Sequence, residues 1–130
     1  MTIENSELVR AAIEAKNSSY SPYSKFRVGA ALLTKDNKIY KGANIENASY
    51  SLCICAERVA FVKALTEGSK EFSKIAIATD DNDFATPCGS CRQFMSEFTD
   101  DLEVILVVNE NLTRSYKLSE LFPNSFKLKH

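Results

Sequence analysis

The side chains best suited to chemistry fall in two short segments, C-A-E-R and P-C-G-S-C. They supply three thiols, those of Cys55, Cys88 and Cys91, which as thiolates can hold a zinc ion. Glu57 adds a carboxylate two residues from one of these ligands. Three protein ligands that leave a fourth position open are typical of catalytic rather than structural zinc. The residues therefore predict a metal site with a proton carrier beside it, as metal-assisted hydrolysis requires.

Both segments are expected to begin helices. Cys88 and Cys91 are three residues apart, so they share one face of a first helical turn, and Cys55 opens the preceding helix. Free backbone N–H groups and a partial positive charge at a helix N-terminus stabilise thiolates. Zinc with three thiolates still carries a net negative charge, which weakens its ability to lower the pKa of bound water. Arg58 is therefore expected to donate hydrogen bonds to one or two of the sulfur atoms.

Two further side chains limit the interpretation. Cys53 could complete a structural four-cysteine zinc site or form a redox pair with Cys55, but at a helix start it is better suited to filling a small apolar gap. His130 is the single histidine, which argues against mechanisms that need a buried imidazole. The general base must then be a carboxylate or a less usual group.

Hydrophobic periodicity and turn residues predict an α/β protein. Alternation of strands and helices in the second half favours a sandwich whose sheet has a largely parallel centre. The expected elements are helices at 5–18, 55–67 and 88–98, strands at 26–32, 38–44, 75–78, 104–108 and 114–118, and a helical turn at 119–121.

Composition places the chain among ordinary globular proteins. Of its 130 residues, 45% are hydrophobic and 25% are charged, with a net charge of -1, so we expect one domain over residues 1–130. Scattered lysines and arginines argue against a nucleic-acid partner. No apolar stretch approaches the roughly 20 residues of a membrane span, and no signal-peptide pattern opens the chain. We therefore expect no membrane association and a cytoplasmic location, where clustered cysteines bind metals more often than they form disulfides.

Four segments together resemble one enzyme family, the small homotetrameric cytidine deaminases that act on nucleosides with zinc. They are Y-S-P-Y-S-K-F-R-V-G-A-A-L at 20–32, N-I-E-N-A-S-Y at 44–50, C-A-E-R at 55–58 and T-P-C-G-S-C-R-Q-F at 86–94. A cysteine before A-E separates the chain from deoxycytidylate and polynucleotide-editing relatives, which usually have histidine there. The resemblance implies a three-layer α-β-α sandwich around a mixed, five-stranded sheet.

The same resemblance implies the reaction and its central residues. Cytidine and 2′-deoxycytidine would lose ammonia to give uridine and 2′-deoxyuridine, a step of pyrimidine salvage, with one zinc ion on the three cysteines. Glu57 would take a proton from the attacking water and pass it to ring N3 and then to the departing amino group. Ala56 would offer its backbone N–H to the base O2, and the carbonyl of Thr86 would receive the amino group.

Other matched positions are implied to bind the rest of the nucleoside. Asn44 and Glu46, two apart on an extended segment, would accept hydrogen bonds from the sugar 3′-hydroxyl. Phe26 would pack against the pyrimidine. Residues expected to complete the site of a neighbouring subunit, so that the homotetramer shares its active sites, are Ala48, Tyr50 and Phe126.

Two other functions stay open at this stage. A blasticidin-type or other aminopyrimidine deaminase would use the same chemistry, although Asn44 and Glu46 favour a nucleoside. A structural zinc module that binds a protein or RNA would instead need four zinc ligands and no role for Glu57. The lack of a basic face counts against its RNA form.

Overall fold

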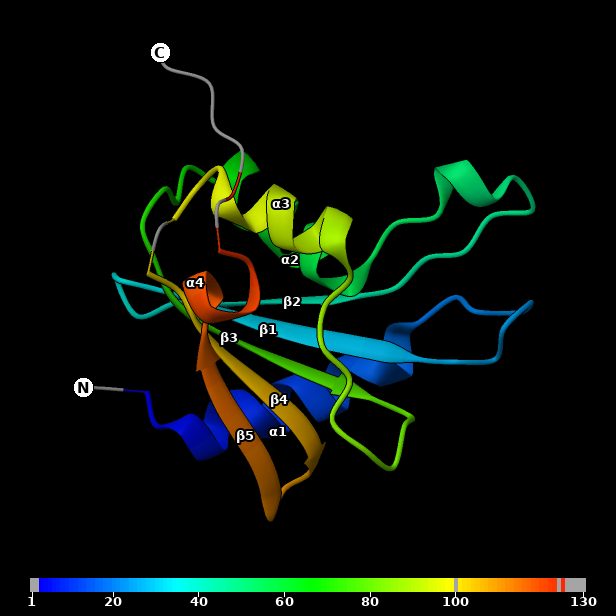
Figure 1. Ribbon diagram of the computed structural model, residues 1–130, viewed down its shortest axis with the longest axis horizontal. Helices are drawn as coiled ribbons and strands as arrows, with labels where there is room; N and C mark the ends of the chain where they lie inside the picture. The colour runs from blue at the N-terminus through cyan, green and yellow to red at the C-terminus, as the bar shows by residue number, and fades with distance from the viewer. Residues whose placement is uncertain (1–2, 100, 124, 126–130) are drawn as a thin grey trace.

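The centre of the fold is a five-stranded sheet, shown in the computed structural model, which describes residues 3–99, 101–123 and 125 (Figure 1). Its strands lie in the order β2-β1-β3-β4-β5. They are β1 (Val28–Thr34), β2 (Ile39–Ala43), β3 (Phe72–Thr79), β4 (Glu103–Asn109) and β5 (Leu112–Lys117).

The predicted mixed sheet is confirmed, with its parallel part limited to one pair at the centre. β3 and β4 run parallel, whereas the β1–β2, β1–β3 and β4–β5 pairs are antiparallel. Short turns join β1 to β2 and β4 to β5, and such connections produce antiparallel hairpins. In the first turn Asn37 has a positive φ of 69°, which asparagine tolerates better than most residues. The connection from β3 to β4 contains a helix and returns the chain in the same direction, so this neighbouring pair is parallel.

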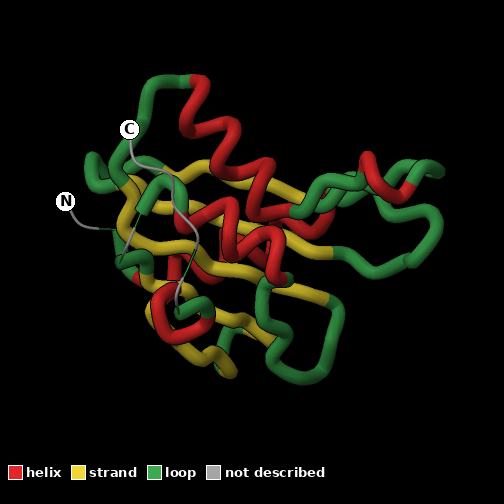
Figure 2. The backbone as a smooth tube through the Cα atoms, turned by 45° about the horizontal axis from the view of Figure 1, so that its top comes forward, coloured by secondary structure: helices red, strands yellow, loops and turns green. Residues whose placement is uncertain are grey.

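Helices cover both faces of the sheet, so the predicted three-layer sandwich is confirmed (Figures 1 and 2). On one face, α1 (Asn5–Ala15) packs through Leu8, Val9 and Ala12 against apolar residues of β1, β3 and β4. The other face is covered by α2 (Ala56–Thr66), α3 (Gly89–Ser96) and α4 (Leu118–Leu121).

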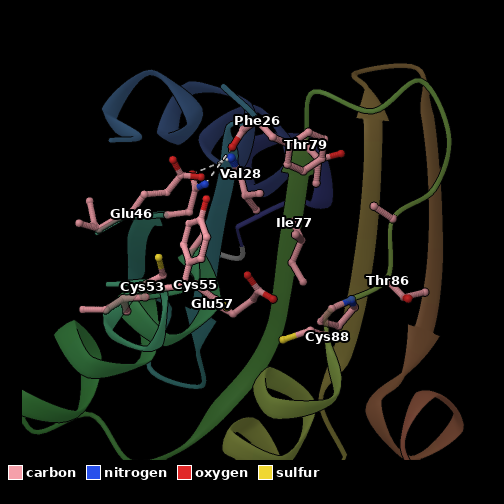
Figure 3. Close-up of a pocket in the computed structure, with 17 residues that line it drawn as sticks. Phe26, Val28, Glu46, Cys53, Cys55, Glu57, Ile77, Thr79, Thr86 and Cys88 are labelled. Atoms are coloured by element: carbon pink, nitrogen blue, oxygen red, sulfur yellow. Dashed lines mark hydrogen bonds between the residues drawn. The ribbon is translucent and has the colours of Figure 1, made fainter. Parts of the chain in front are cut away.

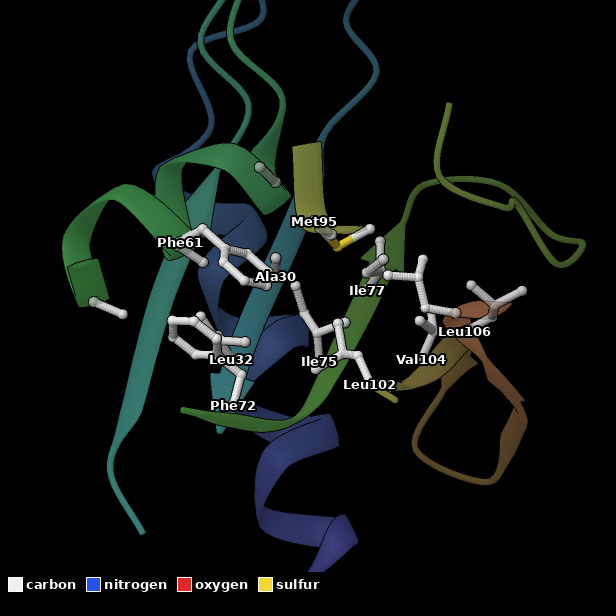
Figure 4. Packing of buried hydrophobic residues seen from close by; sticks show 14 residues of the cluster. Ala30, Leu32, Phe61, Phe72, Ile75, Ile77, Met95, Leu102, Val104 and Leu106 are labelled. Carbon is white, nitrogen blue, oxygen red and sulfur yellow. The ribbon is translucent and has the colours of Figure 1, made fainter. Parts of the chain in front are cut away.

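The larger core lies under α2 and α3 (Figure 4). Phe61 of α2 is fully buried there, and its ring centroid lies 4.8 Å from that of Phe72 on β3. Burying such large apolar side chains removes the most water-exposed carbon surface and is the main source of stability. Other fully buried members of this core are Ala30, Leu32, Ala56, Ala60, Ala64, Ile75, Met95, Leu102 and Val104.

Element ends differ from the sequence predictions by a few residues. The first helix ends at Ala15 and continues as a 3₁₀ turn over Lys16–Ser18. The first strand begins at Val28 rather than at 26, because the carbonyl of Phe26 accepts a side-chain hydrogen bond from Asn44 instead of joining the sheet. A short 3₁₀ helix at Tyr50–Leu52 was not predicted.

Close packing fixes α2 on the sheet. A Cβ at Gly42 on β2 would lie 2.5 Å from the Ala56 carbonyl oxygen and 2.6 Å from the Ala60 nitrogen, so only glycine fits. At its other end, α2 ends at Thr66, just before Gly68, the predicted stop residue, whose φ of +94° suits glycine. Hydrogen bonds from Ser69 N to Ala64 O and from Gly68 N to Leu65 O complete this C-terminal cap. The N-terminus of α2 is thereby held at a fixed place against the sheet.

Candidate active site

Three thiols meet where two helices begin. Cys55 is the N-cap residue of α2, Cys88 is the N-cap residue of α3, and Cys91 lies in the first turn of α3. Their sulfur atoms all lie within 4.8 Å of one another. Sulfurs of a tetrahedral zinc site, at about 2.3 Å from the ion, lie roughly 3.8 Å apart. The cluster therefore has nearly the size that zinc requires.

The charges in this cluster also suit a bound cation. A hydrogen bond from the Cys91 thiol lowers the pKa of Cys55 to about 5, and the guanidinium of Arg58 acts in the same direction. The same hydrogen bond raises the pKa of Cys91. Sulfur atoms this close cannot all ionise together unless a cation offsets their repulsion. Arg58 Nε is buried without a hydrogen-bond partner among the described residues, so a donor remains beside the thiols. The donor set present fits zinc.

Cys53 lies outside this cluster. Its Sγ accepts a hydrogen bond from Asn47 N at 3.3 Å and donates one to Asn47 O at 3.6 Å. Rather than filling an apolar gap, as the sequence suggested, the thiol holds the turn at 47–53. Among the described residues the cluster therefore consists of three cysteines, without the fourth that the structural four-cysteine alternative requires.

Glu57 lies one residue into α2 with its side chain almost fully buried, at 4% exposure. Burial raises the pKa of this carboxyl to about 7. A carboxyl with such a pKa both accepts and releases a proton near neutral pH, which is the property that general acid–base chemistry needs.

Two members of the thiol cluster, Cys55 and Cys88, line one pocket of about 280 Å³ together with Glu57 (Figure 3). This volume is at the lower end of small-molecule sites, which hold roughly 300–1,000 Å³. Nine of the positions singled out from the sequence line it: Phe26, Asn44, Glu46, Tyr50, Cys55, Ala56, Glu57, Thr86 and Cys88.

The remaining predicted positions lie elsewhere. Cys91 and Arg58 sit behind the wall, next to the other thiols. Ala48 is exposed and is not part of the lining, whereas Tyr50 lines the pocket of its own chain. Phe126 is outside the described residues.

Asn44 is already heavily bonded. Its Oδ1 accepts hydrogen bonds from Val28 N at 2.9 Å and Ser19 Oγ at 2.5 Å, and its Nδ2 donates one to Phe26 O at 2.9 Å. Because the amide oxygen has two lone pairs, its capacity to accept is used and one N–H remains. The contact of Asn44 with the sugar stays a prediction, and the group that this pocket-lining side chain still has for such a contact is the N–H donor.

Glu46 complements this donor. It accepts hydrogen bonds from the backbone of Tyr23 at 3.0 Å and of Ser24 at 3.2 Å, and from the Ser24 hydroxyl. These bonds, that of the Ser24 hydroxyl above all, lower the pKa of Glu46 and keep it ionised. A carboxylate accepts about four hydrogen bonds, so capacity remains for a ligand hydroxyl.

Sequence reasoning missed part of the pocket wall. Val28 and Thr79 pair across β1 and β3, and Ile77 lies on the same face of β3 as Thr79. Two-residue alternation along β3 could have placed Ile77 and Thr79 together. The antiparallel register that brings Val28 to them leaves no local signal. The other missed residues are Ile45, Cys53, Ile54, Ala85 and Pro87.

Fold and site together define an α/β protein with a cluster of three cysteines that fits a metal ion, beside the buried carboxyl of Glu57. The family model described as the cytidine and deoxycytidylate deaminase zinc-binding region matches residues 2–107, and the chain belongs to this family. The predicted zinc cofactor is confirmed by this match together with the cysteine cluster.

Individual relatives agree with the family match. A probable cytidine deaminase of Dictyostelium discoideum is 47% identical over 124 residues, covering 95% of this chain and 84% of that protein. A cytidine deaminase of Halalkalibacterium halodurans is 46% identical over 120 residues, covering 92% and 91%. The solved structure of cytidine deaminase from Burkholderia pseudomallei has a TM-score of 0.91 and 42% identity, covering 95% of this chain and 100% of that one.

A blasticidin-S deaminase of Bacillus cereus is more distant, at 32% identity over 125 residues. The cytidine deaminase interpretation is thus favoured over the blasticidin alternative. Within the described part of the chain, every helix is too short or too polar to cross a membrane.

Proposed function

We propose that this protein catalyses the zinc-dependent hydrolytic deamination of cytidine and 2′-deoxycytidine, releasing ammonia and the uridine forms. One observation carries the proposal: a single pocket joins the thiol cluster and Glu57 to a sugar-binding pair, Asn44 and Glu46. When bound, the zinc ion would activate water for attack on ring C4. The pyrimidine salvage of free nucleosides is the metabolic setting that suits this reaction.

Glu57 moves the protons. Its carboxylate takes a proton from the attacking water and delivers it to ring N3. It then carries a second proton from the new C4 oxygen to the departing amino group, which leaves as ammonia. In the metal-free protein, burial raises the pKa of this carboxyl to about 7, and a buried carboxyl that holds a proton this readily suits both steps.

Backbone groups orient the base. The Ala56 N–H belongs to the first turn of α2 and has no helical acceptor, so it is free to donate to O2 of the pyrimidine. The carbonyl of Thr86, which also lines the pocket, receives the amino group. Phe26 packs against the ring from the far end of the pocket. Arg58 donates to the thiolates and offsets their charge.

The sugar site favours a nucleoside. We infer that Asn44 donates through Nδ2 to the 3′-oxygen while Glu46 accepts the proton of the same hydroxyl. A donor and an acceptor side by side match one hydroxyl better than two acceptors would. This pair gives the nucleoside reading its structural support over a blasticidin-type substrate.

The test is turnover of cytidine followed by its ultraviolet absorbance, with 2′-deoxycytidine and blasticidin S as parallel substrates. We expect loss of the amino group from both nucleosides, abolition by a zinc chelator, and recovery on adding zinc. Turnover of blasticidin S with no reaction of cytidine would overturn the proposed substrate.

We also propose that the active protein is a homotetramer in which subunits share sites. Large apolar side chains around the pocket stay exposed, including Tyr50 at 75% and Leu52 at 61%, and a neighbouring subunit would cover them. Ala48 and Phe126 are the further positions implied to reach a neighbour. Mixing a Cys55→Ala variant with a Phe126→Ala variant is expected to restore activity by assembling complete sites. Activity no greater than the sum of the two, despite proven mixed assembly, would contradict sharing.

A cytoplasmic location and a single domain over residues 1–130 complete the proposal. Zinc binding needs Cys55, Cys88 and Cys91 to stay reduced, and all four cysteines are free thiols. All five strands belong to one sheet with helices on both faces, which supports one domain. Fractionation of cells and limited proteolysis would test these two points.

A further inference from the structure

Phe26 is held in place by little packing of its own. It is 38% exposed and lies just before β1. Its neighbour Lys25 has a φ of 59°, a left-handed conformation that is unfavourable for a residue with a side chain. Hydrogen bonds must therefore hold this stretch of chain in its observed course.

Asp80 supplies one set of these bonds, from the residue that follows β3. Its Oδ2 accepts from Arg27 N at 2.9 Å and from Arg27 Nε at 3.0 Å, and its Oδ1 accepts from Arg27 Nη2 at 3.0 Å. Lys16 Nζ adds a longer contact to Oδ1 at 3.4 Å. The bonds from the Arg27 side chain hold the pKa of Asp80 down at about 2, so the carboxylate stays charged at physiological pH. Asp80 thus binds both the backbone and the side chain of Arg27.

Asn44 binds the residues on either side. It donates to Phe26 O and accepts from Val28 N, so three consecutive residues are held by two side chains, one following β2 and the other following β3. Val28 is paired with Thr79, the residue before Asp80. Figure 3 shows Phe26 and Thr79 near each other, at the end of the pocket away from Glu57 and Cys88.

We propose that Asp80 is a positioning residue for the active site. By holding Arg27, Asp80 fixes the position of Phe26, the side chain against which the base packs. This role of Asp80 rests on the proposed function, because the contact of Phe26 with the pyrimidine belongs to that function. Asp80 does not line the pocket and touches neither the thiol cluster nor Glu57. Its loss therefore acts on substrate binding, through Phe26, and leaves the chemistry in place.

The experiment compares Asp80→Ala with wild type in cytidine turnover. We expect KM to rise by roughly 10- to 100-fold, the scale on which a small misplacement of a binding group acts. The kcat value is expected to stay within about threefold and the zinc content to remain at wild-type level, because uniform binding is what is lost. Lys16→Met is the matched control: it removes the other cation at Asp80 and leaves Arg27 untouched, so KM should change by less than about twofold.

A double-variant cycle separates positioning from general destabilisation. In a Phe26→Ala background, Asp80→Ala is expected to have almost no further effect on KM, because the side chain through which it acts is gone. Effects of Asp80→Ala and Phe26→Ala that multiply independently would overturn the proposal, and so would a wild-type KM in Asp80→Ala. If the alanine variant fails to fold, Asp80→Asn gives the same cycle while keeping one acceptor for Arg27 N. Lack of cytidine turnover by the wild type would refute the proposed function instead, which keeps the two failures distinct.

Discussion

Replacing Glu57 by glutamine keeps the size and shape of the side chain but removes its ability to carry a proton. One positioned acid–base group contributes about 10²–10⁴-fold to a rate. Because two proton transfers pass through Glu57 in the proposed reaction, we expect a loss of kcat near the upper figure. A 10⁴-fold loss corresponds to about 5.5 kcal/mol of activation free energy. Zinc content should be unchanged, since none of the three thiols is altered.

The same substitution should stabilise the metal-free protein at alkaline pH. Burial raises the pKa of Glu57 from 4.5 to about 7, so the folded state resists losing this proton. Ionisation of Glu57 therefore lowers the free energy of unfolding. This loss of stability is absent below the pKa of Glu57 in the unfolded chain, grows as pH rises, and is complete above about pH 7. At 1.36 kcal/mol per pH unit it amounts to at most about 3 kcal/mol. Glutamine does not ionise, so chelated Glu57→Gln should gain stability over wild type at pH 8 and gain nothing at pH 4.

Steady-state kinetics, metal analysis and urea unfolding at the two pH values provide the measurements. Glu46→Gln is the matched control, because it removes another carboxylate from the same pocket. That variant should raise KM for cytidine with a smaller change in kcat, since Glu46 binds the sugar. A kcat for Glu57→Gln within tenfold of wild type would refute the proton-transfer role. An equal stability gain at pH 4 and pH 8 would refute the assignment of its cost to ionisation.

Three further predictions concern the metal, the substrate and the pH dependence of stability. Cys88→Ala should lose zinc while Cys53→Ser retains it; metal analysis showing the reverse would reassign the ligands. Cytidine 5′-monophosphate should have a much lower kcat/KM than cytidine, because the sugar site offers the carboxylate of Glu46; equal values would contradict this. Asp80, with its pKa lowered to about 2, stabilises the fold above its unfolded pKa of roughly 3.9. The melting-temperature gap between wild type and Asp80→Asn should stay constant from pH 8 to about 5 and narrow as pH falls towards 2; a constant gap throughout would exclude Asp80 as its source.

The zinc cluster was the part most readily predicted from sequence. Cys88 and Cys91 are three residues apart, and helical geometry alone brings them together. Cys55 is a harder case, because nothing local links it to a segment more than 30 residues later. It was included because Glu57, two residues later, adds the carboxylate that a hydrolytic metal site needs, and the structure brings all three thiols together.

Long-range register was the part that could not be predicted. The apolar run of β4 indicated an inner strand, but not that β1 would lie antiparallel to β3 and bring Val28 to Thr79. Strand partners are chosen by packing over the whole sheet, and the local sequence holds little of that information. Similarly, the first strand begins two residues later than predicted, because the side-chain bonds of Asn44 to Phe26 and Val28 depend on the folded loop.

The close contact of α2 with Gly42 restricts which amino acids this protein can accept at that position. A single added methyl group there would press on the backbone of Ala56 and Ala60 and displace the start of the helix. Cys55 would move with α2, while Cys88 and Cys91, carried by α3, would stay where they are. One sulfur would then separate from the other two. The geometry of zinc coordination thus limits the residues acceptable at Gly42, although Gly42 binds no metal. Zinc affinity then reports how closely α2 lies against β2.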